Sequence, residues 1–441
     1  MKRLSSILLM LVLAGCATTQ SLEAAESTEP SFAIRNVRIF DGERVIPSGT
    51  IVVRGERIAA VGENLNLSGV TEIIDGQGMT VLPGLIDAHF HLQGPDSYKA
   101  ALAFGVTTVI DMFGEYSAAA IKTTLTGLAH RAPDEADTLV SLLVTAPKGH
   151  GTEYGEFPMP QVTSAKECQE AVDNQLAAGA SFVKIIYDAG ESWSAQTLPT
   201  FGRDVLAACI AAAHAHGVVA VVHAITLRES REAIEAGADG LTHAIVNTRS
   251  DPAFAELVSS HKAFVIPTLA VYAGIAGFHN DAAILGDPRL EAYLPPSGLS
   301  GLKMTFPPGF GQGVKPALMQ ENVRQLKASH VPLLAGSDCA NPGTAVGATL
   351  HQELEMLVST ALTPTEALTA ATALPADRFK LSDRGHLAPG LRADLLLVRG
   401  DPTTDIQVTR NIISVWKLGK KLDRDTYRAH IQAERQATAK Q

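Results

Sequence analysis

The residues best suited to chemistry begin with His89 and His91, at the end of the run Val81-Leu82-Pro83-Gly84-Leu85-Ile86-Asp87-Ala88-His89-Phe90-His91. On a β-strand, residues two apart point to the same face, so the two imidazoles project side by side. Two neutral imidazoles presented in this way supply half of a metal site. A structural histidine pair at the end of a strand is the alternative, and the rest of the chain decides between them.

Four further polar residues lie in or at the ends of predicted strands: Lys184, His223, His243 and Asp338. Each has a simpler explanation when taken alone, because a histidine can be satisfied in a core and an aspartate can cap a helix. Lys184, however, would bury an ammonium at a high cost if it had no partner. Conversion to a carbamate would instead make this side chain an anionic bridge between two cations. The six positions together are therefore interpreted as a set of metal ligands.

Repeated strand-helix units must position these residues. Strands are predicted at 82–91, 105–112, 137–145, 181–188, 218–223, 240–246, 263–272 and 331–338, and helices at 165–179, 198–216, 227–236, 251–261 and 314–329. Apolar strands that alternate with helices favour a parallel sheet covered by helices. About eight strands is the number that closes a (β/α)₈ TIM barrel. A doubly wound open sheet is the alternative, but no Gly-x-Gly-x-x-Gly turn follows the first strand.

Short alternating segments on both sides of this barrel predict a second, smaller domain. We expect residues 32–82 and 385–422 to form one discontinuous β-sandwich, with the barrel at 83–384 inserted between its halves. Residues 423–441 are expected to form a C-terminal helix or tail. The predicted fold class is therefore α/β, with a (β/α)₈ barrel inserted into a small β domain.

Two long connections rich in glycine and proline, 147–160 and 274–313, interrupt the barrel. Loops of this length are usually lids or binding loops, and catalytic residues of such barrels lie at the carboxyl ends of the strands. We expect His150, Tyr154 and Tyr187 to contact substrate, with ordinary packing as the alternative. Arginine and lysine are scarce near the predicted strand ends, so the sequence places no clamp for a carboxylate.

The composition excludes some classes of protein. The formal charge is -10, and no basic run is interleaved with aromatic residues, so nucleic acid is not an expected partner. A hydrophobic content of 46% supports a large aliphatic core. Cys168, Cys209 and Cys339 are scattered and odd in number, without a Cys-x-x-Cys pair. We interpret all three as small buried hydrophobic residues and expect no disulfide framework.

The first residues are typical of an export signal. Lys2 and Arg3 precede an apolar run that ends in Leu13-Ala14-Gly15-Cys16, which resembles a bacterial lipobox. We expect residues 1–16 to be a lipoprotein signal peptide with an acylated Cys16, followed by a polar tether at 17–31. A cut near Ala17 without a lipid is the alternative. Ala17, in place of an acidic residue, favours an outer-membrane lipoprotein that faces the periplasm, with the lipid anchor at Cys16 as its only membrane contact.

The order His-x-His, Lys, His, His, Asp on successive strands, flanked by a split β domain, resembles the amidohydrolase superfamily. The stretch Leu82–His89 looks like that family's first barrel strand, and Gly385–Gly390 followed by Ala393-Asp394-Leu395 looks like its return strand. The resemblance covers nearly all of the chain after the leader. It is closest to the imidazolonepropionase-related branch, which includes bacterial metal-dependent dipeptidases and other amide hydrolases.

This resemblance implies a centre with two divalent metal ions, most simply Zn²⁺, although cobalt or manganese also suit such ligands. His89, His91 and Asp338 would hold the more buried ion, and His223 and His243 the other. Lys184 would bridge the ions as a carbamate derived from CO₂. Two metals roughly 3.5–4 Å apart activate a shared hydroxide and polarise the substrate carbonyl. Asp338 would act as general base and then as general acid.

The expected function is hydrolysis of an amide C–N bond in a small molecule, such as a dipeptide or an N-acyl amino acid, by a protein that can form a homo-oligomer. A lactone or ester hydrolase, a mononuclear deaminase and a non-catalytic binding lipoprotein are the alternatives. The deaminase branch lacks the lysine of the fourth strand and has an acid three residues after the histidine of the fifth. Here Lys184 is present, and Thr226 is the third residue after His223.

Overall fold

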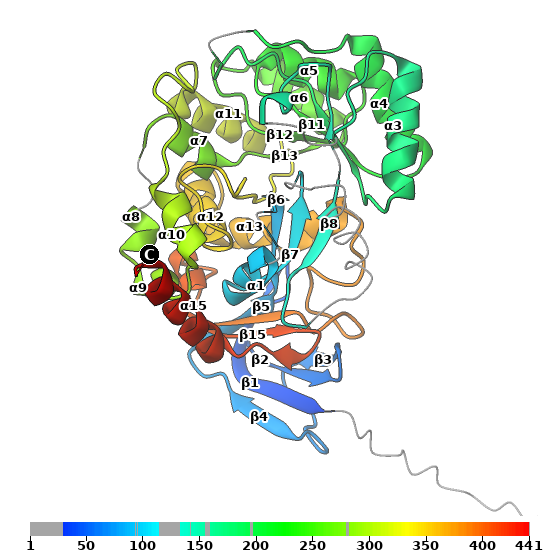
Figure 1. Ribbon diagram of the computed structural model, residues 1–441. Helices are drawn as coiled ribbons and strands as arrows, with labels where there is room; N and C mark the ends of the chain where they lie inside the picture. Colours follow the sequence, from blue (N-terminus) through cyan, green and yellow to red (C-terminus); the bar gives the residue numbers. More distant parts are fainter. Residues whose placement is uncertain are drawn as a thin grey trace, which may run out of the picture.

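The computed structural model describes residues 30–440 except 93, 95, 114–132, 142, 155–158, 195–196 and 279–281. The predicted signal peptide and nearly all of the predicted tether lie outside the described residues. The described chain forms a barrel, in the upper part of Figure 1, and a β domain, in the lower part. The β domain combines strands from the beginning and from the end of the described chain. Within the described residues, no helix combines the length and apolarity needed to cross a membrane.

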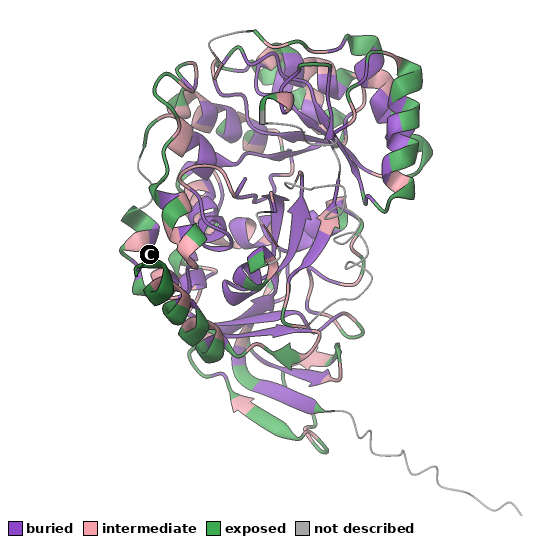
Figure 2. Cartoon of the chain, viewed as in Figure 1, coloured by how far each residue is buried: buried purple, intermediate pink, exposed green. Residues whose placement is uncertain are grey.

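Short parallel strands form the wall of the barrel. They are β6 (Leu85–Phe90), β7 (Val106–Asp111), β8 (Asp137–Val140), β9 (Leu143–Val144), β10 (Val183–Ile186), β11 (Ala220–His223), β12 (Gly240–Thr242) and β13 (Phe264–Ile266). Their pairing gives one sheet in the order β6-β7-β8 and another in the order β13-β12-β11-β10-β9. The strand residues are almost all buried, as the purple strands of Figure 2 show. Burial on both faces explains why the sequence shows apolar runs here without alternation.

Hydrogen bonds between the two sheets close the barrel. On one side, the amide of Ser181, just before β10, donates to Val140 of β8 at 2.8 Å. On the other side, residues 331–338 run between β13 and β6. Leu333 forms a parallel bridge with Val265, and Cys339 forms one with Phe90. If β8 and β9 are taken as one interrupted strand and 331–338 as the last, the ring has the predicted eight positions.

Helices cover the barrel on its outside and supply its connections. They are α1 (Asp96–Ala103), α3 (Ala165–Ala177), α4 (Arg203–Ala215), α5 (Leu227–Glu235), α6 (Pro252–Ser260), α7 (Leu269–Ile275), α8 (Ala282–Leu285), α9 (Pro288–Glu291), α10 (Pro296–Lys303), α11 (Pro316–Ala328), α12 (Ala348–Thr360), α13 (Pro364–Ala370), α14 (Ala373–Arg378) and α15 (Arg424–Thr438), with 3₁₀ turns η1 (Thr152–Tyr154) and η2 (Ile406–Arg410). Figure 2 shows their exposed sides in green and their buried sides in purple. An apolar side facing a core is what stabilises such surface helices.

One predicted strand is wrong in its second half. The apolar run from Ala263 to Tyr272 was expected to be extended throughout, but β13 ends at Ile266 and α7 begins at Leu269. The buried carboxylate of Glu353, on α12, accepts the amide hydrogens of Leu269 and Ala270 at 3.0 and 2.8 Å. A distant acid therefore satisfies the free amides at the helix start, a contact that local sequence does not reveal.

The β domain is built from both ends of the described chain. Its strands are β1 (Ser31–Phe40), β2 (Val45–Arg54), β3 (Arg57–Gly62), β4 (Glu72–Asp75), β5 (Met79–Pro83), β14 (Leu395–Arg399), β15 (Ile412–Lys417) and β16 (Lys420–Lys421). Hydrogen bonds join all of them into one mixed sheet of eight strands, in the order β16-β15-β14-β5-β1-β2-β3 with β4 beside β1. The domain predicted as a sandwich is thus a single bonded sheet. The barrel and the sheet domain confirm the predicted fold class.

A buried ionic cluster joins the barrel to the sheet. Asp137, at the start of β8, accepts hydrogen bonds from Arg384 and Arg392 at 2.6 Å each and from Lys417 of β15 at 2.8 Å. Lys417 is fully buried, and the other three side chains are at most 9% exposed. Arg384 also pairs with Asp383 at 2.8 Å and Arg392 with the buried Asp394 at 3.1 Å, whereas the one ion pair of Lys417 among the described residues is with Asp137. Removal of Asp137 would therefore leave the buried ammonium of Lys417 without a carboxylate partner.

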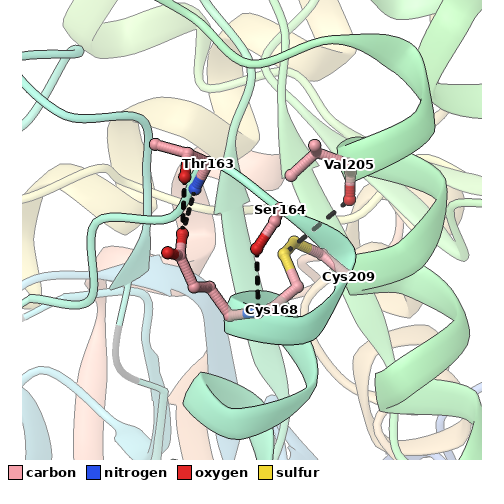
Figure 3. The surroundings of a disulfide bond; sticks show 6 residues. Thr163, Ser164, Cys168, Val205 and Cys209 are labelled. Atoms are coloured by element: carbon pink, nitrogen blue, oxygen red, sulfur yellow. Dashed lines mark hydrogen bonds between the residues drawn. A yellow bond between two sulfur atoms is a disulfide. The ribbon is translucent and has the colours of Figure 1, made fainter.

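The cysteines correct one prediction. All three are buried as expected, but Cys168 on α3 and Cys209 on α4 form a disulfide, whereas only Cys339 is a free thiol among the described cysteines. Figure 3 shows the bond joining the two neighbouring helices. The Cα atoms of Cys168 and Cys209 are 5.1 Å apart. The pairing depends on the packing of α3 against α4, which the scattered spacing of the cysteines does not indicate.

Candidate active site

The six predicted ligands surround one cavity at the carboxyl ends of the barrel strands. Its volume is about 360 Å³, and its wall includes His89, His91, Lys184, His223, His243 and Asp338. Five of the six side chains are buried, and His91 is 28% exposed at its side chain. The structure therefore brings together residues from five strand positions that the sequence spreads over 250 residues. Their role as metal ligands stays a prediction.

His91 and Asp338 lie on one side of this cavity together with His89. Asp338 Oδ1 is 2.9 Å from Nε2 of His91 and 3.4 Å from Nε2 of His89. The two imidazole Nε2 atoms are 3.2 Å apart. Nδ1 of His91 is 2.5 Å from the carbonyl oxygen of Phe113, to which it donates. Burial alone would lower the pKa of His91, but the hydrogen bond between its Nε2 atom and Asp338 and the charge of that carboxylate raise it. When the ring is neutral and Nδ1 donates, its lone pair is on Nε2.

A close approach between β6 and the last strand brings Asp338 to the histidines. Gly336 makes this approach possible, because a Cβ atom there would lie 2.7 Å from Cβ of His89 and 2.6 Å from Ile266. The buried carboxylate of Asp87 then joins the two strands, since it accepts the amide and the hydroxyl of Ser337 at 2.9 and 2.6 Å. Asp338 itself has a φ of 51° and begins no helix, so it does not act as a helix cap. A non-glycine residue held in this region is strained, and such strain is frequent at functional sites.

His223 and His243 lie on the other side of the cavity and face each other. Nδ1 of His243 is 2.5 Å from the hydroxyl of Thr268, which uses its own hydrogen on the Pro267 carbonyl at 2.8 Å. His243 must therefore donate from Nδ1 and keep its lone pair on Nε2. Nε2 of His223 donates to Asp188 at 3.0 Å, so its lone pair is on Nδ1. These two lone-pair nitrogens are 3.2 Å apart, and a shared cation would relieve their repulsion.

The electrostatic environment keeps these ligands available to a cation. Burial lowers the pKa of His89 and of His243 well below 6.5, and neighbouring cationic groups, Lys184 among them, lower it further. Both imidazoles are therefore neutral at neutral pH. Burial also lowers the pKa of Lys184 to about 7, although the charge of Asp338 opposes this. Its Nζ atom donates to Thr242 at 2.8 Å. A neutral amine is the form of lysine that adds CO₂ to give a carbamate.

Asp188 is a site residue that the sequence analysis missed. It is 1% exposed and lies just after β10, four residues beyond Lys184. Its Oδ2 atom accepts hydrogen bonds from His223 Nε2 and from the indole of Trp193, at 3.0 and 2.8 Å. Burial by itself would raise the pKa of Asp188, but the hydrogen bond and charge of His223 hold it well below its usual range. The simple alternation of strand residues would have placed Asp188 on the same face as Lys184.

The three predicted substrate contacts have different outcomes. His150 lines the cavity, and its Nδ1 atom is 2.6 Å from Glu153. Tyr187 does not line the cavity, because its hydroxyl donates to Glu232 at 2.6 Å and its ring stacks on Phe201, away from the site. Its predicted contact with substrate is therefore corrected. The side chain of Tyr154 lies outside the described part of the chain.

The donor set fits divalent metal ions. Among the residues that the structure describes, two groups of three have possible ligand atoms within 4.8 Å of one another, namely His89, His243 and Asp338, and His150, Asp188 and His223. The first group and the facing lone pairs of His223 and His243 supply imidazole and carboxylate ligands in a buried site. Such ligands suit zinc and similar ions. The chain therefore offers what a metal-dependent hydrolase requires.

Comparison with known proteins agrees with this geometry. The model of the Amidohydrolase family matches residues 80–422. Imidazolonepropionase of Mycolicibacterium smegmatis is 27% identical over 368 residues, which cover 80% of this chain and 85% of that protein. A dihydroorotase of Wolbachia is 36% identical over only 104 residues, or 21% of this chain and 24% of that enzyme.

Solved structures share the fold. A Xaa-Pro dipeptidase with bound methionine superposes with a TM-score of 0.72 and 21% identity, covering 89% of this chain and 99% of that one. The ochratoxinase of A. niger superposes with a TM-score of 0.71 and 18% identity, covering 89% and 95%. The chain therefore belongs to the amidohydrolase family, as a metal-dependent hydrolase that acts on C–N bonds.

Proposed function

We propose that this protein is an exported, lipid-anchored enzyme that uses two divalent metal ions to cleave amide bonds in dipeptides or N-acyl amino acids. The observation that carries the proposal is the convergence of His89, His91, Lys184, His223, His243 and Asp338 on one cavity. The Xaa-Pro dipeptidase among the structural relatives supports the dipeptide part of the proposal. The ions, most simply Zn²⁺, would supply electrophilic polarisation of the carbonyl and a water of lowered pKa.

The chain's own residues would then position the groups and move the protons. His89, His91 and Asp338 would hold one ion and His223 and His243 the other, with the Lys184 carbamate between them. Asp338 would accept a proton from the attacking water and return it to the leaving nitrogen; the position of its carboxylate at the cavity wall supports this role. Asn341 donates to Asp338 Oδ1 at 3.0 Å and fixes the orientation of that carboxylate.

The disulfide supports export. Disulfides form and persist in oxidising compartments such as the bacterial periplasm and are rare in the cytosol. The Cys168–Cys209 bond is therefore compatible with the export signal proposed for residues 1–16. Mass spectrometry of the membrane-bound protein would test the anchor. We expect an acylated Cys16 at the mature N-terminus and release of the Cys16→Ser variant into the soluble fraction; an unmodified N-terminus would contradict the anchor.

Lys184→Ala tests the bridging role. We expect the variant to bind less metal and to have a lower kcat/KM than the wild type. The decrease in kcat/KM should exceed the roughly 10- to 100-fold effect that is typical when a residue hydrogen-bonded to a metal ligand is removed. Lys166→Ala is the matched control, because Lys166 is 85% exposed on the outer helix α3. Activity towards a library of dipeptides and N-acyl amino acids, and metal content by elemental analysis, are the two measurements. Undiminished activity and metal content in Lys184→Ala would refute the bridge.

A further inference from the structure

A row of aromatic rings leads from the predicted metal ligands to residues of the long loop 274–313 that line the same cavity. His150 lies 5.0 Å from His223 and 4.5 Å from Trp193, measured between ring centroids. Trp193 lies 5.3 Å from Phe310, and Phe310 stacks on Phe306 at 4.9 Å. We call His150, Trp193, Phe310 and Phe306 the aromatic row. All four residues line the cavity that holds the predicted ligands.

The row is held in place by hydrogen bonds behind its rings. The indole of Trp193 donates to Asp188, and His150 Nδ1 is bonded to Glu153, so neither polar group is left to face a ligand as a free donor. The amide of Gly311 donates to the carbonyl of Trp193 at 3.1 Å, which ties the 274–313 loop to the loop after β10. The rings of Trp193, Phe306 and Phe310 therefore present a fixed apolar surface before any substrate arrives, and His150 is the polar end of the row, next to His223.

The remaining wall is also apolar. Leu92, Phe113, Leu143, Ile186, Tyr272 and Ile275 complete much of the described lining. Lys184 is the only lysine or arginine among the described residues of this wall. Apolar walls with a few convergent polar groups are typical of sites for largely apolar ligands. Rings on the wall favour an aromatic ligand in particular, because offset or edge-to-face ring pairs add to the energy of burial.

We infer that the substrate carries an aromatic group beside the scissile amide, and that this group packs against the aromatic row. The inference rests on the proposed amide hydrolysis and names its substrate class. The carbonyl would lie among the predicted ligands, with the aromatic group extending towards Phe310 and Phe306. The row thus selects among amides, while the metal-site residues carry out the reaction.

The test compares ligands that differ only in the aromatic group. One pair is N-phenylacetyl and N-acetyl derivatives of the same amino acid, assayed for kcat/KM. The other is phenylacetohydroxamate and acetohydroxamate, whose binding to the metal-loaded protein is measured by calorimetry. We expect the aromatic member of each pair to be favoured about 10- to 100-fold, the range for apolar pocket contacts. Equal binding of the two hydroxamates would overturn the inference.

Two variants of the same loop locate the contact. Phe310→Ala should remove most of the aromatic preference, which is the ratio of the two kcat/KM values and of the two hydroxamate affinities. Phe278→Ala is the matched control, because Phe278 is 59% exposed and lines a neighbouring cavity instead. Equal effects of the two variants would contradict the assignment. If neither amide is hydrolysed, the proposed function fails, and the hydroxamate preference still decides the inference.

A second inference rests on the hydrogen bonds of Asp188. Its Oδ1 atom accepts the amide of Gly190 at 2.7 Å, and its Oδ2 atom accepts from His223 and Trp193. The carboxylate is therefore fixed from both sides, and its bond to His223 selects the ring form that carries hydrogen on Nε2. Carboxylates behind metal-binding histidines fix ring orientation and raise basicity in this way.

We propose that Asp188 is a positioning residue that holds His223 with Nδ1 directed at the second metal ion. This inference also rests on the proposed metal centre. Asp188→Ala should weaken binding of the second metal equivalent about 10- to 100-fold, measured by competition with a chelator. Glu229→Gln is the matched control, because Glu229 is equally buried and accepts the amide of Ala189 at 3.1 Å without contacting His223.

The outcomes separate the possible roles. An affinity for metal equal to that of the wild type, even with a lower melting temperature, would leave Asp188 with only a structural role and overturn the inference. Complete loss of the second equivalent, as expected for His223→Ala, would make Asp188 a ligand and also overturn it. A wild-type protein that binds no metal would overturn both this inference and the proposed function.

Discussion

Removal of the Cys168–Cys209 disulfide should lower the free energy of unfolding by an amount that depends on the number of residues between the two cysteines. The two cysteines are 41 residues apart in sequence. If the bond acts by restricting the unfolded chain, closure of a loop of that length contributes about 4 kcal/mol at 25 °C. This is large in comparison with the 5–15 kcal/mol that is typical of whole domains, to order of magnitude. The Cys168→Ala/Cys209→Ala variant should therefore unfold at a clearly lower denaturant concentration.

The assay uses a soluble chain that begins after Cys16. Thiol titration in denaturant should find one reactive thiol, that of Cys339, without reductant and three with it. Urea unfolding, followed by circular dichroism, should then show a similar decrease in the free energy of unfolding for the reduced wild type and for the double alanine variant. The Cys339→Ala variant is a control with a buried cysteine outside the bond.

Two results would refute this reasoning. Three reactive thiols in protein prepared under oxidising conditions would show that the bond does not form. If reduction leaves the urea concentration at the unfolding midpoint unchanged, the bond does not restrict the unfolded chain as assumed. The first result would also remove the support that the disulfide gives to export.

Further predictions concern the ionic cluster and the metal ions. Asp137→Ala should lower the free energy of unfolding by about 3–5 kcal/mol, measured by denaturant titration, because it leaves the buried ammonium of Lys417 without its carboxylate partner. Burial would raise the pKa of Asp137, but Lys417 and the two arginines hold it well below 3.8. The stability that Asp137 contributes is therefore fully present above pH 3.8 and is lost as the pH falls further. The free energy of unfolding should consequently fall less steeply with decreasing pH in the variant than in the wild type. The same pH dependence in both proteins would contradict this. Removal of metal by a chelator should lower the melting temperature reversibly, since lone pairs of His223 and His243 then face each other, and a melting temperature insensitive to added Zn²⁺ would count against the centre.

The sequence predicted most of the barrel because its periodic apolar strands and the polar residues at their ends carry strong local signals. Lys184 could be placed at the site because an ammonium on a buried strand demands a special explanation. Tyr187 was misplaced for an avoidable reason. Strand residues alternate between faces, so a residue three positions after Lys184 points towards the helices, whereas Asp188 points inwards.

Other features depended on contacts between distant segments. The aromatic row combines Trp193, from the loop after β10, with Phe306 and Phe310 of another loop, and no local pattern links these positions. The disulfide required knowledge that α3 lies beside α4. The start of α7 depended on Glu353 from α12. Each of these is decided by tertiary packing, which outweighs local preference.

The junction between β5 and β6 has a consequence for biosynthesis. β5 pairs with β14 from Met79 to Pro83, and β6, which carries His89, starts after a single glycine. The first pair of imidazoles thus receives its final support only when the segment Leu395–Arg399 has been synthesised. We therefore expect metal acquisition to follow the docking of β14 onto β5, late in the maturation of the protein.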